Sequence, residues 1–371
     1  MIKRIFTKTN KRKQKLTTEK CSYQQQPKWL APKHYKQTLK MAIKRQIIFM
    51  FFLFHTSLLC GQNYVDYHRT FNRIDKNILS NNYREAIKQL DSIYSKFDFI
   101  YAKHCFKALQ ICVSANDSIK ADKWLEKSFK QGIPIWIIRI NEITNKSLSY
   151  STTQKTLNSF DSLHSIYNAS INTKLREKID SILIIDQKFT QKMNTGFVLF
   201  KPIFWLQWGA HNKRQLKLLK KIIETYGYPE ERLIGLSTIQ DSAAFARTFT
   251  FWGPSELRDS KVQIMLQHCY STWHTIDIDF KDALFKNLCD GNIPAFQFAL
   301  IIDFMFPDKP KYMKENYFKG NGDLKLENIE KMNESRNSIG LPNIEQEKRN
   351  ILINIERRKN KKANSEIMLE T

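Results

Sequence analysis

The residues best suited to chemistry are polar side chains spread through the second half of the chain. His268, which follows Gln267, flanks an apolar stripe. A histidine in that position can act as a general base if a carboxylate such as Asp303 orients its second ring nitrogen. Asn212 and Asp186 are the remaining catalytic candidates. The simpler interpretation makes His268 a half-buried structural histidine, Asn212 a helix N-cap, and Asp186 a solvated or capping residue.

Signatures of metal sites and of activated nucleophiles are absent from the sequence. His268 and His274 are six positions apart, which places them on different faces of a helix, so we expect no zinc site. No GxSxG, HExxH or glycine-rich phosphate loop occurs. We therefore expect neither a metal nor a cofactor.

Four cysteines lie beyond the first 61 residues, and their spacing matches no metal-binding motif. Cys105 and Cys112 are interpreted as small core residues, because free cysteine is commonly buried. An oxidising compartment would permit a disulfide between Cys269 and Cys289, but the sequence does not require one.

Aromatic residues are concentrated between Phe197 and Trp208 and again around Trp252. Core packing accounts for most of them. An aromatic groove for a peptide or a sugar is the alternative, with Trp205, Trp208, Trp252 and Gln267 as candidate binding residues.

The elements that must position these residues are predicted to be helices. Glycine accounts for only 11 of 371 residues, about half its usual share, which favours an all-α fold. An apolar stripe predicts a helix from about Lys174 to Met193. A second helix is expected to begin at Asn212 as N-cap and to end at Gly227, with Pro229 beyond it.

Residues 62–145 carry a repeat. Ala86, Leu90 and Tyr94 recur 35 positions later as Ala121, Leu125 and Phe129. This offset is close to the 34-residue tetratricopeptide period, so we predict tetratricopeptide-like helical hairpins, with a turn and N-cap at 116–118. Such hairpins can bind peptides, and a plain helical packing module is the alternative.

Two further segments flank the predicted C-terminal domain. Residues 146–173 are rich in Ser, Thr and Asn, and we interpret them as a linker that holds at most one short helix. Residues 346–371 form a basic tail, interpreted as a solvated, fraying helix or as a contact for anionic lipid or polysaccharide.

The N-terminus resembles a targeting segment. Residues 1–40 hold twelve Lys and Arg against one acidic residue and are interpreted as an over-called upstream extension. Met41 then opens a signal peptide over 41–61, with a basic start, an apolar centre and cleavage after Gly61. A basic arm with a hydrophobic anchor is one alternative. A lipoprotein acylated at Cys60 is another, which the bulky Leu59 disfavours.

Several short motifs of the C-terminal half, taken in order, resemble one family. They are Asp186-Gln187, Asn212, Gly227-Tyr228-Pro229, Gln267-His268 and Asn333-Glu334-Ser335-Arg336. Over about residues 174–345 the chain resembles domain-of-unknown-function family 6624, an uncharacterised bacterial helical domain. The resemblance implies a helical fold and no established activity.

The chain departs from that family at two points. Asp303-Phe304 stands where the family tends to have Asp-Arg, and Tyr317-Phe318-Lys319-Gly320 stands where it tends to have a Tyr-Gly-x-Gln turn. If the missing Arg and Gln carry chemistry in the family, this copy has lost it.

These features favour an exported, non-catalytic binding or scaffold module of the bacterial cell envelope, with a protein or peptide as partner. The net charge falls from +24 to +11 without the first 61 residues, so we do not expect nucleic-acid binding. Membrane contact is expected only transiently, through the signal segment. The alternative is a hydrolase-like enzyme, or a degenerate relic of one, with a site around His268 and Asp303.

Overall fold

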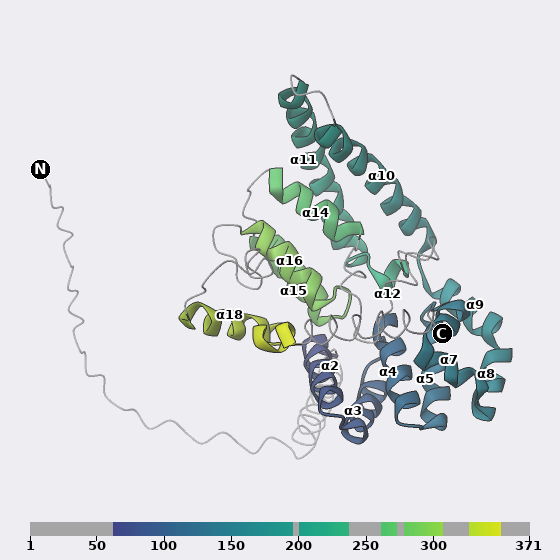
Figure 1. Ribbon diagram of the computed structural model, residues 1–371. Helices are drawn as coiled ribbons and strands as arrows, with labels where there is room; N and C mark the ends of the chain where they lie inside the picture. The colour runs from purple at the N-terminus through teal and green to yellow at the C-terminus, as the bar shows by residue number, and fades with distance from the viewer. Residues whose placement is uncertain (1–61, 196–199, 237–260, 273–277, 307–325, 350–371) are drawn as a thin grey trace, which may run out of the picture. The chain divides into compact units, whose positions relative to one another are not determined.

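A computed structural model describes residues 62–195, 200–236, 261–272, 278–306 and 326–349. In these ranges every regular element is a helix and no strand occurs, which confirms the all-α prediction (Figure 1). None of the described helices is long and apolar enough to span a bilayer. The predicted extension and signal peptide at 1–61 lie outside the described residues, as do Trp252, the segment 317–320 and most of the basic tail.

Four helices open the described chain, and each packs on the next. They are α2 (Tyr64–Leu79), α3 (Tyr83–Lys96), α4 (Ala102–Ser114) and α5 (Ser118–Lys130). The turn and N-cap predicted at 116–118 are confirmed, because Asn116 adopts a positive φ of 57° and the Asp117 side chain accepts the amide of Lys120 at 3.0 Å.

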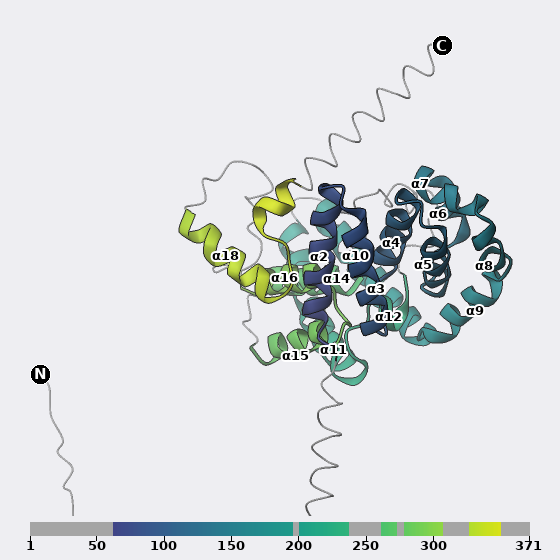
Figure 2. The same ribbon diagram turned by 90° about the horizontal axis from the view of Figure 1, so that it is seen from below.

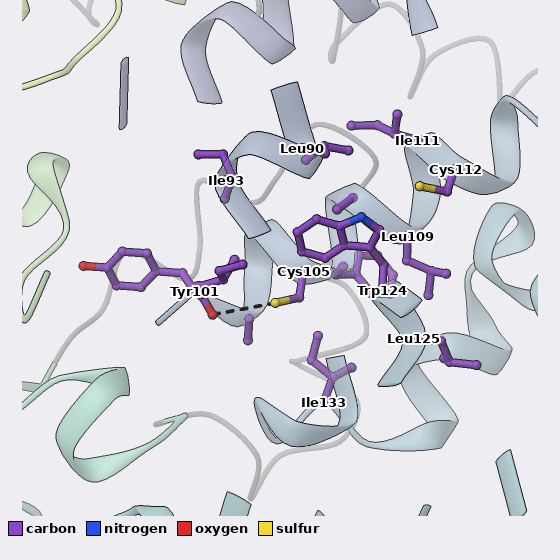
Figure 3. Close-up of a cluster of buried hydrophobic side chains, with 14 of the residues drawn as sticks. Leu90, Ile93, Tyr101, Cys105, Leu109, Ile111, Cys112, Trp124, Leu125 and Ile133 are labelled. Atoms are coloured by element: carbon purple, nitrogen blue, oxygen red, sulfur yellow. Dashed lines mark hydrogen bonds between the residues drawn. The ribbon is translucent and has the colours of Figure 1, made fainter. Parts of the chain in front are cut away.

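The repeated positions of this segment lie in one core. Ala86, Ala121, Leu90 and Leu125 are fully buried around Trp124. Figure 3 shows Trp124 with Leu90 and Ile93 on one side and Ile133 on the other. The 35-residue offset therefore marks positions that pack in or against this core, with Tyr94 only partly buried, while the tetratricopeptide assignment itself stays a prediction.

Residues 146–173 are not the linker that we expected from their composition. With the helices just before them they form a run of short helices: α6 (Ile135–Ile140), α7 (Glu142–Asn145), η1 (Lys146–Ser149), η2 (Ser151–Thr153), α8 (Gln154–Asn158) and α9 (Phe160–Ser170). The hydroxyls of Ser147 and Thr153 are buried and bind backbone carbonyls. Ser147 donates to Thr144 at 2.6 Å, and Thr153 donates to Ser147 at 2.6 Å. These two hydroxyls thus satisfy backbone carbonyls at the ends of short helices instead of facing solvent.

The C-terminal half contains the longest helices. They are α10 (Thr173–Thr195), α11 (Lys201–Tyr226), α12 (Glu231–Ile234), α14 (Lys261–Thr272), α15 (Ile278–Cys289), α16 (Ala295–Met305) and α18 (Leu326–Ser338). Helices α10 and α11 run side by side, and α14 contacts both of them as well as α16 (Figure 1). Gly227 ends α11 with a φ of 84°, as predicted.

The two halves share their packing. Backbone contacts group residues 61–371 into one compact unit, and α2 lies between the α4 to α9 helices and α18 (Figure 2). Val65 of α2 belongs to the core of the C-terminal helices, whereas Leu236 belongs to the core of the N-terminal ones. The Tyr101 hydroxyl donates to the carbonyl of Gly291 at 3.1 Å. Apart from Val65 and Leu236, the first core ends at Leu163 and the second begins at Leu175, so the two cores are in contact while the domain boundary at 146–173 stays a prediction.

Candidate functional site

Three helices of the C-terminal half bring Asp186, Asn212 and His268 together. Asp186 lies in the middle of α10 and is fully buried, and Nδ1 of His268 on α14 is 2.7 Å from its Oδ2. The His268 side chain keeps 22% of its surface exposed. A buried carboxylate thus holds an imidazole that solvent reaches.

Two amides complete the environment of the Asp186 carboxylate. Gln187 donates to Oδ2 at 3.1 Å, and Gln215 of α11 donates to Oδ1 at 3.1 Å. Both oxygens are therefore hydrogen-bonded, as a buried carboxylate requires. Because Asp186 accepts from Nδ1, the neutral ring of His268 carries its proton there and keeps the lone pair on Nε2.

Asn212 is not the N-cap that we predicted. Helix α11 begins at Lys201, with Pro202 in its first turn, because the aromatic residues before Trp208 continue the helix. Asn212 is fully buried in mid-helix, and its Nδ2 donates to the carbonyl of His268 at 3.1 Å. The simpler interpretation of Asp186, as a solvated or capping residue, is also wrong.

Asp303 is not the carboxylate that orients His268, contrary to our prediction. It is buried on α16, which packs against α14. The carboxylate that binds Nδ1 of His268 is that of Asp186. The carboxylate partner therefore comes from α10, the helix after the predicted linker, and not from α16.

The aromatic candidates divide between the site and the surface. Trp208 is buried, and its ring meets His268 edge-on at 5.6 Å between centroids. Trp205 packs on Trp208 at 5.6 Å and is 46% exposed. Gln267 accepts a hydrogen bond from Gln263 of its own helix at 3.3 Å. Trp208 is thus the candidate binding residue that touches His268.

Two polar residues of the site were missed from the sequence. Gln215 links Asp186 to His211, because its Oε1 is 2.7 Å from Nε2 of His211. Trp208, His211, Asn212 and Gln215 are spaced by three, four and seven positions on one face of α11. Polar residues repeated on the buried face of a long helix are the signal that would have found them.

Cys269 beside the histidine is not an activated nucleophile. Its thiol donates to the carbonyl of Asn212 at 3.4 Å, and burial raises its pKa to about 12. Neither Cys269 nor Cys289 is in a disulfide. In the described ranges no three His, Cys, Asp or Glu side chains gather as metal ligands.

Residues of the Asn333-Glu334-Ser335-Arg336 motif stabilise the turn after α18. Arg336 is almost fully buried, donates to the carbonyl of Pro342 at 2.8 Å and pairs with Glu347. Asn333 accepts the amide of Ile344 at 3.0 Å. These side chains hold the segment after α18 in place.

Comparison with protein-family models, with curated proteins and with solved structures found no match to this chain. The resemblance to family 6624 therefore stays a prediction.

Proposed function

We propose that the chain carries an acid–base site in which His268 transfers a proton and Asp186 orients the imidazole. The observation that carries this proposal is the 2.7 Å contact between Nδ1 of His268 and the fully buried Asp186. An aspartate that accepts from Nδ1 fixes the tautomer and stabilises the imidazolium once Nε2 has taken a proton. The site thus suits a hydrolase-like reaction, in which the base activates water.

The neighbours of His268 agree with this role. Since the Cys269 thiol stays protonated, water or a substrate hydroxyl is the nucleophile that the site suits. The indole N–H of Trp208 is buried and has no hydrogen-bond partner among the described residues. A polar ligand beside the imidazole would satisfy this donor, which is otherwise costly to bury.

Activity is tested with a panel of chromogenic esters, phosphoesters and glycosides. We expect His268→Gln to lower the rate about 10²- to 10⁴-fold, as loss of a general base does. His164→Gln, which changes a partly buried histidine of α9, is the matched control and should keep the wild-type rate. Turnover that survives His268→Gln would exclude this histidine as the base.

Chemical modification tests the site without a substrate. Diethyl pyrocarbonate reacts with neutral imidazole, and peptide mass spectrometry measures the rate at each histidine. We expect His268 to react readily and Asp186→Asn to slow it, because the amide no longer fixes the proton on Nδ1. An unreactive His268, or one indifferent to Asp186→Asn, would contradict the proposal.

A binding function is the second candidate, and a groove on the N-terminal helices favours it. The groove has a volume of about 910 Å³ and lies between α3 and the start of α5. Its lining combines apolar Tyr83 and Ile87 with charged Arg84 and Lys120, of which Lys120 is paired with Asp91 at 2.6 Å. This mixture suits a peptide.

The binding candidate is tested by crosslinking. A photo-crosslinking residue placed at Tyr83 should give a partner band in cell-envelope extracts, whereas the same residue at exposed Lys146, outside the groove, should not. Identical band patterns from both positions would count against a docking groove.

We propose, with either function, that the protein is exported to the cell envelope. The basic and apolar pattern of residues 41–61 supports export. N-terminal sequencing of the protein from cells is the test. A mature start at Gln62 would support cleavage, and a start at Met1 or Met41 would contradict it.

A further inference from the structure

A small pocket lies where α2 and α4 meet the start of α16, away from His268. Its volume is about 200 Å³. The side chains and backbone that line it are His68, Phe71, Asn72, Asp75, Lys103, His104, Lys107, Pro294, Ala295, Phe296, Gly340 and Leu341. Most of the polar groups in this set are hydrogen-bond donors.

Two lysines face one carboxylate in this pocket. Lys107 pairs with Asp75 at 2.6 Å, which satisfies the acid. No carboxylate among the described residues forms an ion pair with Lys103. Burial lowers the pKa of its amine, against the weaker attraction of Glu231, Asp75 and Glu230. A partly buried amine without a direct ion pair is costly, and an anion in the pocket would offset that cost.

The two histidines of the pocket add donors rather than charge. Burial raises the pKa of Tyr67 well above its ordinary value, so its hydroxyl keeps the proton. That hydroxyl accepts the amide of Tyr101 at 3.2 Å and lies 2.8 Å from Nδ1 of His104. Burial holds the pKa of His104 well below its usual range, so its ring is neutral. Nδ1 is the acceptor that the Tyr67 proton reaches among the described residues, and we therefore assign the His104 proton to Nε2.

His68 is held in the opposite tautomer. The amide of Ala295 donates to its Nε2 at 3.4 Å, and burial lowers the pKa of the ring to about 3. The neutral ring thus carries its proton on Nδ1. Each histidine has one N–H to donate and no positive charge of its own.

The start of α16 supplies a further positive field. This helix of eleven residues begins at the pocket wall with Pro294, Ala295 and Phe296. The N-terminus of a helix carries the positive end of its dipole. The amine, the imidazole donors and the helix start come from three helices around one small space.

We infer that this pocket binds a small tetrahedral oxyanion, phosphate or a phosphate monoester group, with Lys103 as its counter-ion. A phosphate supplies the negative charge that Lys103 lacks and several acceptors for donors on different sides. The volume suits a group of a few heavy atoms. This inference does not depend on the proposed acid–base site.

The test is titration of the full chain with inorganic phosphate and, separately, with glycerol 3-phosphate, by calorimetry. We expect saturable binding that Lys103→Met weakens at least tenfold and Lys103→Arg largely retains. Lys96→Met removes an exposed amine of α3 and is the matched control. Tighter binding of glycerol 3-phosphate would assign the site to a monoester, and tighter binding of phosphate to the free ion.

Thermal unfolding shows whether Lys103→Met still folds. Without phosphate, Lys103→Met should melt at or above the wild-type temperature, because a buried unpaired amine is gone. With phosphate at about 100 times its Kd, the wild type should gain roughly 3–8 °C and the variant should not. No binding by the wild type up to about 10 mM of either probe, or equal binding by Lys103→Met, would overturn the inference.

Discussion

Glu231 offers the sharpest test of how the two halves are joined. Helix α4 has no side-chain N-cap of its own, and the carboxylate of Glu231 on α12 accepts the amide of Ala102 in its first turn. Burial raises the pKa of Glu231 to about 8 against the bond from Ala102, and the like charge of Glu230 adds to the rise. Lys103 opposes it.

The sign of the pH dependence follows from this pKa. Between its ordinary value of 4.5 and about 8, folded Glu231 keeps a proton that the unfolded chain releases. Its contribution to stability is therefore full below about pH 4.5 and is lost as the pH rises through about 8. The difference between these two pKa values corresponds to at most about 5 kcal/mol, and we expect roughly 2–3 kcal/mol because Glu231 keeps partial exposure.

Glu231→Gln isolates this effect. The amide keeps an oxygen for Ala102 and cannot ionise. We expect equal free energies of unfolding for variant and wild type near pH 4, with the variant more stable by roughly 2–3 kcal/mol near pH 9. Urea unfolding followed by circular dichroism measures the difference. His68 and His104 have lowered pKa values, which make stability rise with pH in both proteins. This contribution cancels when the free energy of the wild type is subtracted from that of the variant.

Exposed Glu177→Gln is the matched control and should show no such divergence. Parallel pH profiles for Glu231→Gln and the wild type would refute the reasoning. So would a variant that is less stable throughout, because the carboxylate would then be bound as an anion.

Three further outcomes are expected. Gly291→Ala should destabilise the fold by about 2–4 kcal/mol in urea unfolding, because its φ is 76° and a Cβ would lie 2.6 Å from the ring of Tyr64; an unchanged midpoint would mean that the ring has room to move. Asp186→Ala should cost about 3–5 kcal/mol by the same measurement, since it strands a buried cluster of donors; a loss under about 1 kcal/mol would indicate that water replaces the carboxylate. Alkylation with mass spectrometry should label half-buried Cys289 well before buried Cys269, and a disulfide between them would contradict the structure.

The parts of the fold that the sequence predicted are those set by nearby residues. Asp117 caps the helix that follows it by accepting an amide three residues later, and Gly227 ends a helix through its own positive φ. Asn212 has the same capping chemistry but lies inside a helix, and its side chain binds a carbonyl on α14. Sequence spacing alone does not distinguish a capping amide from one that bridges two helices.

The sequence predicted which residues belong to the candidate site better than it predicted which of them bind one another. His268 needed a carboxylate, and Asp186 and Asp303 were both available in the sequence. The choice between them depends on how α10 packs against α14, which no local pattern records. Gln215 was missed because an amide within a basic stretch resembles a solvated residue until its partners are known.

The shared packing of the two halves has a consequence for synthesis. The Tyr101 hydroxyl binds the carbonyl of Gly291, which lies 190 residues later in the chain. At about 5–20 residues per second, a ribosome needs roughly 10–40 s to make that partner. Until then the Tyr101 hydroxyl lacks this acceptor and Val65 lacks the C-terminal core in which it is buried. We therefore expect the N-terminal helices to reach their full stability only after residue 291 has been made.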